Sequence, residues 1–407
     1  MKKNLYLKYS LLLLLGAVLI TSCGKDAAPV LYDEYNNSGT ATPVVSSISP
    51  ADSAWGGYDT LTISGTNFSP VPANNLVWFD NVETFAVAST PTQIKVVVPH
   101  YPKDSVKVRV DVTTAHEYTL YNKPFRIKPM QVTAWNLTMS EVPYVIALDK
   151  DANIYSFIKA SGTGAGIQKE NVNKTVTQYL PQVSGYDWKA FKMGPGGVLY
   201  ATRGVTAIWQ IPETQKVPSP WVTKTQGITA NIFDLDFDAQ GNCWAGGAGN
   251  SLFRVTQAKV GTKFTIAADS VRSIRVFNNY VYVAGKKDSV EKVWRYQISG
   301  ETLGQEETIL DFSARYPKVS IRAITFAVDG TMYIGTNSIT SPILAVSPSG
   351  QFSDLLPGVT KGFVTSFASF GSYLYYAREI TSSKDGDQKI FRVNTFKQMA
   401  PYYGASL

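Results

Sequence analysis

The stretch Ile324-Thr325-Phe326-Ala327-Val328-Asp329-Gly330-Thr331-Met332-Tyr333 decides the fold, because its pattern recurs along the chain. An apolar run leads into a turn with Asp and Gly, and an apolar–aromatic pair follows the turn. The other copies of this pair are Ile154-Tyr155, Leu199-Tyr200, Cys243-Trp244, Val281-Tyr282 and Leu374-Tyr375. A third apolar stretch follows at Ile208–Ile211, Leu252–Val255, Val293–Tyr296, Ile343–Val346 and Ile390–Val393. The pattern predicts units of short strands joined by tight turns.

The spacing of these units predicts the architecture. Their aromatic positions are 45, 44, 38, 51 and 42 residues apart, and a period in the forties with three or four strands per unit indicates a β-propeller. Six units fill residues 129–407. The third strand of the first unit is hard to find around Ser161–Gly164, which leaves the blade count open by one. Residues 129–137 lie outside the pattern, and we expect them to supply an outer strand that closes the ring against the C-terminal blade.

A different pattern occupies residues 43–128. It begins at Pro43–Pro50 and contains the pair Gly56-Gly57 and the unit Gly65-Thr66-Asn67-Phe68. Alternating apolar stretches follow at Val77–Phe79, Ile94–Pro99 and Val106–Val112. This order resembles the IPT/TIG domain, an immunoglobulin-like sandwich of cell-surface proteins, in which the glycine pair opens a turn and the aromatic residue of Gly-x-x-Phe plugs the sandwich.

The repeat of residues 129–407 resembles a six-bladed NHL-type propeller. The expected fold class is therefore all-β, with an IPT/TIG sandwich followed by a six-bladed β-propeller. A composition with 12% aromatic residues, 31 Gly and 21 Pro agrees with all-β construction.

The N-terminus predicts export and lipidation. Lys2, Lys3 and Lys8 precede an apolar run from Leu11 to Ile20, which is typical of a secretory signal and too short to span a bilayer. The run ends in Ile20-Thr21-Ser22-Cys23, which resembles a lipobox. The resemblance implies cleavage after residue 22, lipidation of Cys23 and a membrane anchor; an ordinary signal peptide with an incidental Cys is the alternative. Residues 23–42 have no hydrophobic period and are expected to be a flexible tether. Lys25-Asp26 looks like a signal for the outer face of the outer membrane.

Charge and residue usage exclude several classes of function. Removal of the three signal lysines lowers the net charge from +7 to +4, and no run of Lys or Arg remains, so nucleic-acid binding is not expected. His100 and His116 both precede the propeller, which removes Ser-His-Asp catalysis and His-ligated metals from the larger domain. Cys243, the only other cysteine, is expected to be a small buried hydrophobe. No catalytic residue, metal or cofactor is expected, although a glycosidase needs only two carboxylates.

Two short motifs have competing interpretations. Asp149–Asn153 and Asp236–Asp238 mimic the start of a calcium loop but lack its Gly and bidentate Glu, so hairpin turns are favoured. Asp-Ser/Thr followed by an apolar residue looks like an O-glycosylation site of exported bacterial proteins, with coincidence as the rival. These sites are Asp52-Ser53-Ala54, Asp59-Thr60-Leu61, Asp104-Ser105-Val106, Asp269-Ser270-Val271 and Asp288-Ser289-Val290.

The candidate ligand-binding residues lie in the loops that a propeller gathers at one mouth. Aromatic rings stack on the C–H faces of sugars, and Arg, Asp and Asn bind hydroxyls or carboxylates. The residues before the innermost strands are Tyr186, Asp187, Trp188, Arg272 and Arg322. Those after the second strands are Arg203, Lys286, Asn337 and Arg378. For any one of them, a solvated or folded-back side chain is the alternative.

A lipidated Cys, a tether, an IPT/TIG sandwich and a propeller together resemble the accessory surface lipoproteins of Sus-like glycan-uptake systems. The resemblance implies a lipid-anchored outer-membrane protein that binds polysaccharide or oligosaccharide and works with a TonB-dependent transporter and a SusD-like protein. Two alternatives stay open: a structural propeller that docks a partner protein, and a carbohydrate-active lyase or hydrolase.

Overall fold

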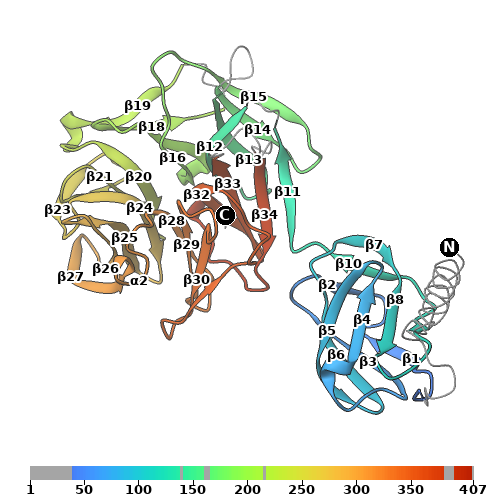
Figure 1. Ribbon diagram of the computed structural model, residues 1–407. Helices are drawn as coiled ribbons and strands as arrows, with labels where there is room; N and C mark the ends of the chain where they lie inside the picture. The colour runs from blue at the N-terminus through green and yellow to red at the C-terminus, as the bar shows by residue number, and fades with distance from the viewer. Residues whose placement is uncertain (1–38, 138–140, 160–165, 214–216, 380–388, 406–407) are drawn as a thin grey trace, which may run out of the picture. The chain divides into compact units, whose positions relative to one another are not determined.

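The computed structural model describes residues 39–137, 141–159, 166–213, 217–379 and 389–405 (Figure 1). Two compact units divide near residue 127. Cys23, the predicted signal segment and the predicted tether up to residue 38 lie outside the described residues. In the ranges that are described, no helix has the length and apolar character needed to cross a membrane.

The N-terminal unit is a β-sandwich whose two layers share one long strand. The first half of β5 pairs with β4, and its second half pairs with β6. The resulting strand order is β1-β3-β6-β5-β4-β8-β9, beside a small sheet β2-β10-β7. The bounds are β1 Val44–Ser49, β2 Ser53–Trp55, β3 Thr60–Thr66, β4 Asn75–Phe79, β5 Val82–Thr90, β6 Gln93–Val97, β7 Lys103–Val106, β8 Val108–Val112, β9 Thr119–Leu120 and β10 Phe125–Lys128, with the 3-10 turn η1 at Pro72–Asn74.

The Gly-x-x-Phe unit does what the sequence predicts. Phe68 is 4% exposed and lies in the core of the sandwich. A Cβ on Gly65 would lie 1.8 Å from the carbonyl oxygen of Val44 and 2.7 Å from the Phe68 ring, so only glycine allows strands β1 and β3 and the aromatic plug to approach this closely.

The C-terminal unit is a ring of six four-stranded antiparallel sheets (Figure 1). Blades 1 to 3 consist of β12 Val142–Leu148, β13 Ile154–Lys159, β14 Gly166–Glu170, β15 Val176–Pro181; β16 Ala190–Gly194, β17 Val198–Thr202, β18 Ala207–Ile211, β19 Ser219–Thr223; and β20 Ile232–Phe237, β21 Cys243–Gly247, β22 Ser251–Val255, β23 Gly261–Thr265. Blades 4 and 5 consist of β24 Ser270–Phe277, β25 Tyr280–Lys287, β26 Val290–Ser299, β27 Thr302–Asp311; and β28 Ile321–Phe326, β29 Met332–Thr336, β30 Ile343–Val346, β31 Phe352–Asp354. Blade 6 consists of β32 Phe363–Phe370, β33 Tyr373–Glu379, β34 Lys389–Asn394 and β11 Gln131–Asn136. Short turns of helix are η2 Pro195–Gly197, η3 Lys224–Gln226, α2 Phe312–Arg315 and η4 Tyr403–Ala405. The predicted fold class and the count of six blades are confirmed.

Strand β11 closes the ring, as the sequence predicts. It pairs antiparallel with β34, with Gln131 opposite Val393 and Trp135 opposite Ile390. Trp135 is 3% exposed and packs in a cluster that includes Tyr375 and Ile390. The first and last parts of the unit therefore meet in one blade. The missing third strand of blade 1 is β14, which begins after the stretch where the sequence pattern failed.

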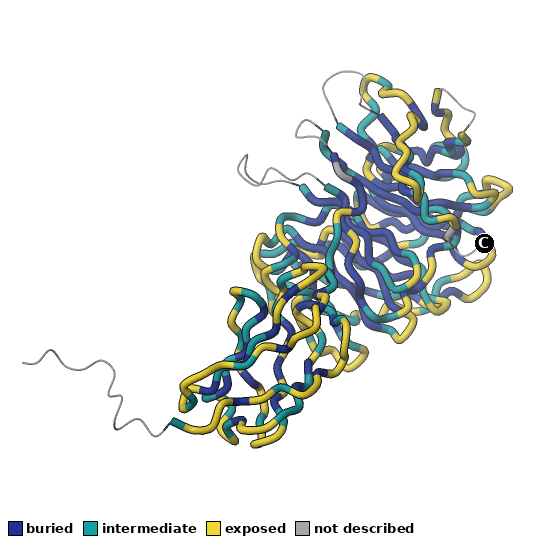
Figure 2. Tube along the Cα trace, turned by 90° about the vertical axis from the view of Figure 1, so that its right-hand side faces the viewer, coloured by how far each residue is buried: buried dark blue, intermediate teal, exposed yellow. Residues whose placement is uncertain are grey.

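The repeated apolar–aromatic pairs form the cores between blades. Tyr200 and Trp244 are fully buried, and Tyr333 is 2% exposed. Cys243 is also fully buried, and burial raises the pKa of its thiol well above the usual value, so it behaves as the predicted small hydrophobe. Figure 2 shows buried residues following the blade strands and exposed residues marking the loops.

The C-terminal segment crosses the axis of the ring. The backbone N–H of Ala400 donates to Phe326 of blade 5, and Arg275 of blade 4 donates to the carbonyls of Ala400 and Pro401. The Tyr403 ring then packs on Phe237 of blade 3. A segment that binds the innermost strands of three successive blades lies across the central channel.

Candidate functional site

The innermost strands begin at one end of the ring and surround a cavity of about 250 Å³, which we call the mouth cavity. Every blade contributes to its wall, because β12, β16, β20, β24, β28 and β32 all start there. The lining residues are Tyr144, Val145, Lys189, Phe233, Ser270, Val271, Arg272, Arg322, Thr365 and Glu379. The sequence predicts Arg272 and Arg322 at this mouth, and the structure places both in the same cavity.

Arg322 and Arg272 have different surroundings in the mouth cavity. Arg272 Nε lies 3.2 Å from Glu291 Oε1, and Lys286 Nζ lies 3.7 Å from the same oxygen. The Glu291 side chain is only 4% exposed, so one nearly buried carboxylate serves two cations. Arg322 is exposed and has no ion-pair or hydrogen-bond partner among the described residues. Its guanidinium is therefore available to a ligand.

A second ionic cluster adjoins the cavity on the side of blades 1 and 2. Asp187 lies 2.7 Å from Lys159 Nζ and 2.7 Å from Lys189 Nζ. The two ammonium groups also lie 4.1 and 5.5 Å from the centre of the Tyr144 ring. Partial burial raises the pKa of Asp187, but hydrogen bonds and charges from Lys159 and Lys189 outweigh it, and the net pKa is lowered. Asp187 is therefore ionised and holds two lysines around an aromatic ring.

The prediction that Trp188 presents its ring to a ligand is wrong. Trp188 is 2% exposed, and its ring packs edge to face against Trp209 at 5.8 Å. Tyr186 is half-buried and lies under the guanidinium of Arg203, whose carbon is 3.4 Å from the ring centre. Arg203 also donates to the carbonyl of Gly185 at 2.6 Å. Trp188, Tyr186 and Arg203 therefore pack on the protein and not against a ligand. The rings of Trp188 and Tyr186 are stabilised more by burial against the blade core than by exposure to water.

Two other predicted residues have structural roles. The side-chain oxygen of Asn337 accepts a hydrogen bond from the backbone N–H of Ser320 at 2.7 Å and so fixes the loop before β28. Arg378 is 8% exposed, with its guanidinium 4.9 Å from the centre of the Phe391 ring. Neither residue lines the mouth cavity.

Charged side chains that the sequence pattern did not identify continue below the mouth. A space of about 30 Å³ shares Arg272 and Arg322 with the mouth cavity and reaches Lys192, Asp234 and Tyr402. Burial raises the pKa of Asp234, and the charge of Lys192 offsets only part of this effect. Burial lowers the pKa of Lys192, but the charges of Asp234, Tyr402 and Asp236 outweigh it, and the net pKa is raised.

A buried ion pair lies deeper in the channel. Arg275 Nη1 lies 2.7 Å from Asp236 Oδ2, and each side chain is 1% exposed. Asp236 also accepts from the backbone N–H of Val276 at 2.8 Å. The guanidinium of Arg275 and the ammonium of Lys192 lie 3.8 and 4.8 Å from the centre of the Tyr402 ring. The C-terminal segment is thus bound by charged groups of the channel wall.

The calcium-like motifs are hairpin turns, as the sequence analysis favoured. Asp149 accepts from the backbone N–H groups of Asp151 and Asn153. Asp238 does the same for Gln240 and Asn242, so both carboxylates hold the turn after an innermost strand.

Comparison with known proteins supports each half of the fold. Residues 43–127 match the family model of the IPT/TIG domain, so the N-terminal unit is an IPT/TIG domain. No curated protein matches the chain. An auxiliary nutrient binding protein from Bacteroides thetaiotaomicron is similar in structure, with 12% identity, 87% of this chain and 97% of that chain covered, and a TM-score of 0.53. A luciferin-regenerating enzyme matches with 14% identity, 68% of this chain and 99% of that chain covered, and a TM-score of 0.53. At these identities the likeness establishes the fold alone.

Proposed function

We propose that this protein is a glycan-binding accessory protein of the bacterial surface and that the mouth cavity is its binding site. The observation that carries the proposal is the convergence of six innermost strands on one cavity that holds an aromatic ring, a carboxylate and an unpaired arginine. A cavity at the centre of a rigid ring keeps these groups in place before the ligand arrives, which lowers the entropic cost of binding.

The charge of the mouth favours an acidic glycan. The described cations in and beside the cavity are Lys159, Lys189, Arg272, Lys286 and Arg322, and the carboxylates are Asp187, Glu291 and Glu379. Five positive groups face three negative ones, which leaves an excess of two. A uronate or sulfate group would offset this positive charge and accept charge-assisted hydrogen bonds from the cations. The Tyr144 ring offers a surface on which a sugar ring can stack.

We further propose that binding occurs without catalysis. Two carboxylates line the mouth cavity and the space below it, Glu379 and Asp234. Asp234 accepts backbone hydrogen bonds from Leu235 at 2.8 Å and Ile274 at 2.7 Å, and these bonds engage both of its oxygens. Among the other described carboxylates of the mouth, Asp187 and Glu291 are each held by two cations, so neither supplies a free second carboxylate for glycoside hydrolysis beside Glu379.

The expected localisation completes the proposal. We place the protein on the outer membrane, anchored through Cys23 and working with a TonB-dependent transporter and a SusD-like protein of a Sus-like uptake system. The lipobox-like Ile20–Cys23 and the IPT/TIG domain support this placement. A Bacteroides protein of similar fold that is described as an auxiliary nutrient binding protein supports the accessory role.

Arg322→Ala is expected to weaken binding of an oligogalacturonate about tenfold or more, because one charge-assisted hydrogen bond contributes roughly 1.5–3 kcal/mol. The remaining affinity should fall less steeply with added salt than that of the wild type. Titration calorimetry at two salt concentrations measures both effects.

Two controls belong to this experiment. Arg392→Ala removes an exposed arginine on β34 outside the cavity and should leave affinity unchanged. The methyl ester of the same oligogalacturonate keeps the sugar rings and removes the charge. Equal affinity for acid and ester would show that the mouth does not select acidic glycans.

Cys23→Ala is expected to release the protein from the membrane fraction without changing its fold, because acylation requires the thiol. Acyl labelling and fractionation measure the effect, and thermal unfolding of the released protein checks the fold. A Cys23→Ala protein that is still tightly bound to the membrane would overturn the anchor.

A further inference from the structure

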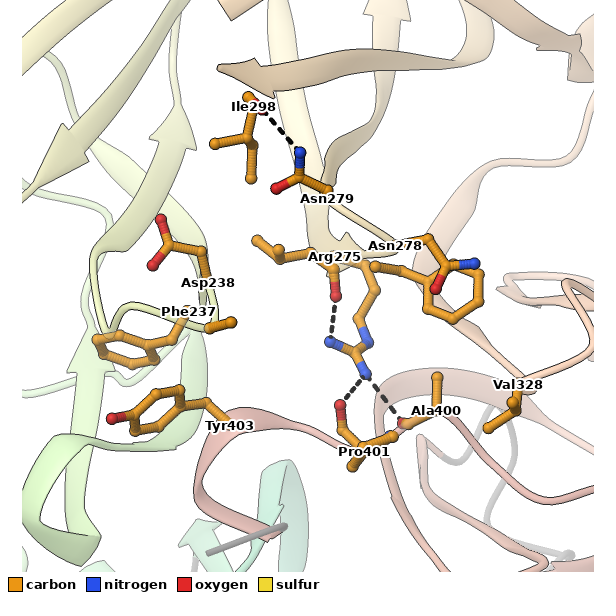
Figure 3. Close-up of a pocket in the computed structure, with 13 residues that line it drawn as sticks. Phe237, Asp238, Arg275, Asn278, Asn279, Ile298, Val328, Ala400, Pro401 and Tyr403 are labelled. Carbon is orange, nitrogen blue, oxygen red and sulfur yellow. Dashed lines mark hydrogen bonds between the residues drawn. The ribbon is translucent and has the colours of Figure 1, made fainter. Parts of the chain in front are cut away.

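A second and larger cavity lies where the innermost strands β20 and β24 end, whereas the mouth cavity lies where they begin, so the two cavities are on opposite faces of the propeller. Figure 3 shows the residues that line it. Its volume is about 530 Å³, which is in the range of small-ligand sites. The first hairpin turns of blades 3, 4 and 5 form its sides, and Ala400, Pro401 and Tyr403 of the C-terminal segment form its floor. We call it the far-face cavity.

The charged groups of the far-face cavity are bound by other groups of the chain. Arg275 pairs with Asp236 and donates to three backbone carbonyls, those of Val276, Ala400 and Pro401. Asp238 is 2% exposed and accepts from the Asn242 amide and from the indole N–H of Trp244 at 2.9 Å. The charge of Arg275 is balanced by Asp236, whereas the nearly buried Asp238 is held by neutral donors. The cavity therefore offers no unpaired cation to an acidic group among the described residues that line it, and it favours an uncharged ligand. The mouth, with its excess of cations, has the opposite preference.

Aromatic rings lie on two sides of the far-face cavity. On one side Tyr403 packs against Phe237, with ring centres 6.0 Å apart. On the other side Phe277 stacks on Phe326, with centres 4.9 Å apart and an angle of 10° between the planes. Phe277 and Tyr403 are half-buried and line the cavity, so each keeps ring surface for contact with the apolar face of a ligand.

Two asparagines that line the cavity supply hydrogen-bonding groups (Figure 3). Asn278 and Asn279 have positive φ angles of 47° and 62°, as the tight turn between β24 and β25 requires. Asn279 donates to the carbonyl of Ile298 at 2.8 Å, which fixes its amide (Figure 3). The Asn278 side chain is exposed and has no hydrogen-bond partner in the part of the chain that the structure describes. An amide both donates and accepts, as recognition of hydroxyl groups demands.

We propose that the far-face cavity is a second carbohydrate site, specific for a neutral sugar of one or two rings. The aromatic surfaces contact the C–H faces of the sugar, and the two amides bind its hydroxyls. The cavity is separated from the mouth by the C-terminal segment, so the two sites bind independently and differ in the charge that they select. This inference stands without the function proposed for the mouth.

The test uses the full chain from Gly24 and a panel of neutral mono- and disaccharides with ligand-observed NMR and calorimetry. At least one sugar of the panel should bind, and Asn278→Gly should weaken it tenfold or more, because the change removes the amide while glycine keeps the positive φ. Hydrogen exchange of residues 276–280 should slow when the sugar is added.

Two control variants separate this site from others. Ala152 also has a positive φ, of 60°, after the first strand of blade 1, so Ala152→Gly makes the same backbone change away from the cavity and should leave affinity unchanged. Arg322→Ala should likewise leave neutral-sugar binding unchanged. The proposal is overturned if no neutral sugar binds, or if binding is insensitive to Asn278→Gly. Failure of acidic glycans to bind would overturn the mouth proposal instead.

Discussion

A fragment that begins at residue 138 is expected to remain unfolded, whereas one that begins at residue 129 folds cooperatively. The shorter fragment lacks β11, the partner of β34 in blade 6. Loss of the buried Trp135 alone corresponds to about 3–5 kcal/mol, and the β11–β34 hydrogen bonds are lost as well. The sum approaches the whole stability of a typical domain, about 5–15 kcal/mol.

Circular dichroism and urea unfolding of the two fragments measure this difference. The fragment from residue 129 is the matched control, because it differs only in the closing strand and its flanking residues. Trp135→Ala in the full chain gives an intermediate case and should lower the unfolding free energy by about 3–5 kcal/mol. Equal stability of the two fragments would mean that blade 6 is stable with three strands.

Arg275→Met is expected to lower the unfolding free energy by about 3–5 kcal/mol, because it leaves the carboxylate of Asp236 buried without its partner. The backbone carbonyls of Ala400 and Pro401 also lose their donor. Urea unfolding at neutral pH measures the loss. Replacement of both partners, Asp236→Leu with Arg275→Met, should recover part of it, since neither member of the pair is then left buried without its partner.

An exposed ion pair provides the comparison. Arg295 lies 2.6 Å from Glu307, and the two side chains are 33% and 48% exposed. Water screens this pair, so Arg295→Met should cost about 1 kcal/mol or less. A similar cost for Arg275→Met and Arg295→Met would contradict the role assigned to the buried pair.

The fold could be predicted because its repeated features are local. The pairs such as Leu199-Tyr200 and Met332-Tyr333 fill the same core position in successive blades, so burial imposes the same residue types at a constant period. The closing strand could be inferred because residues 129–137 had no place in that period. Gly65 and Phe68 were informative for a similar reason, since a close backbone approach admits only glycine.

The candidate site could be predicted only in part. The position of Arg272 and Arg322 follows from topology, because loops before innermost strands meet at the mouth. The burial of Trp188 does not follow, since the same position can point into the blade or into solvent. Lys192, Asp234 and Arg275 were missed because each lies in an apolar strand, and Asp236, which was assigned to a hairpin turn, lies in strand β20 and pairs with Arg275. Charged residues inside such strands signal a channel wall, where alternate side chains face the axis.

The C-terminal segment across the axis limits which ligands can enter the mouth. A polymer cannot be threaded through this ring, since residues 399–403 obstruct its exit. Under the function proposed for the mouth, only a chain end, a branch tip or a short side group of a glycan can enter the cavity below the exposed Arg322 and reach Lys192 and Tyr402. Affinity should then depend on the structure of the chain end and not on chain length. A long polysaccharide and a short fragment with the same end should bind with equal affinity when their concentrations are expressed as moles of chain ends.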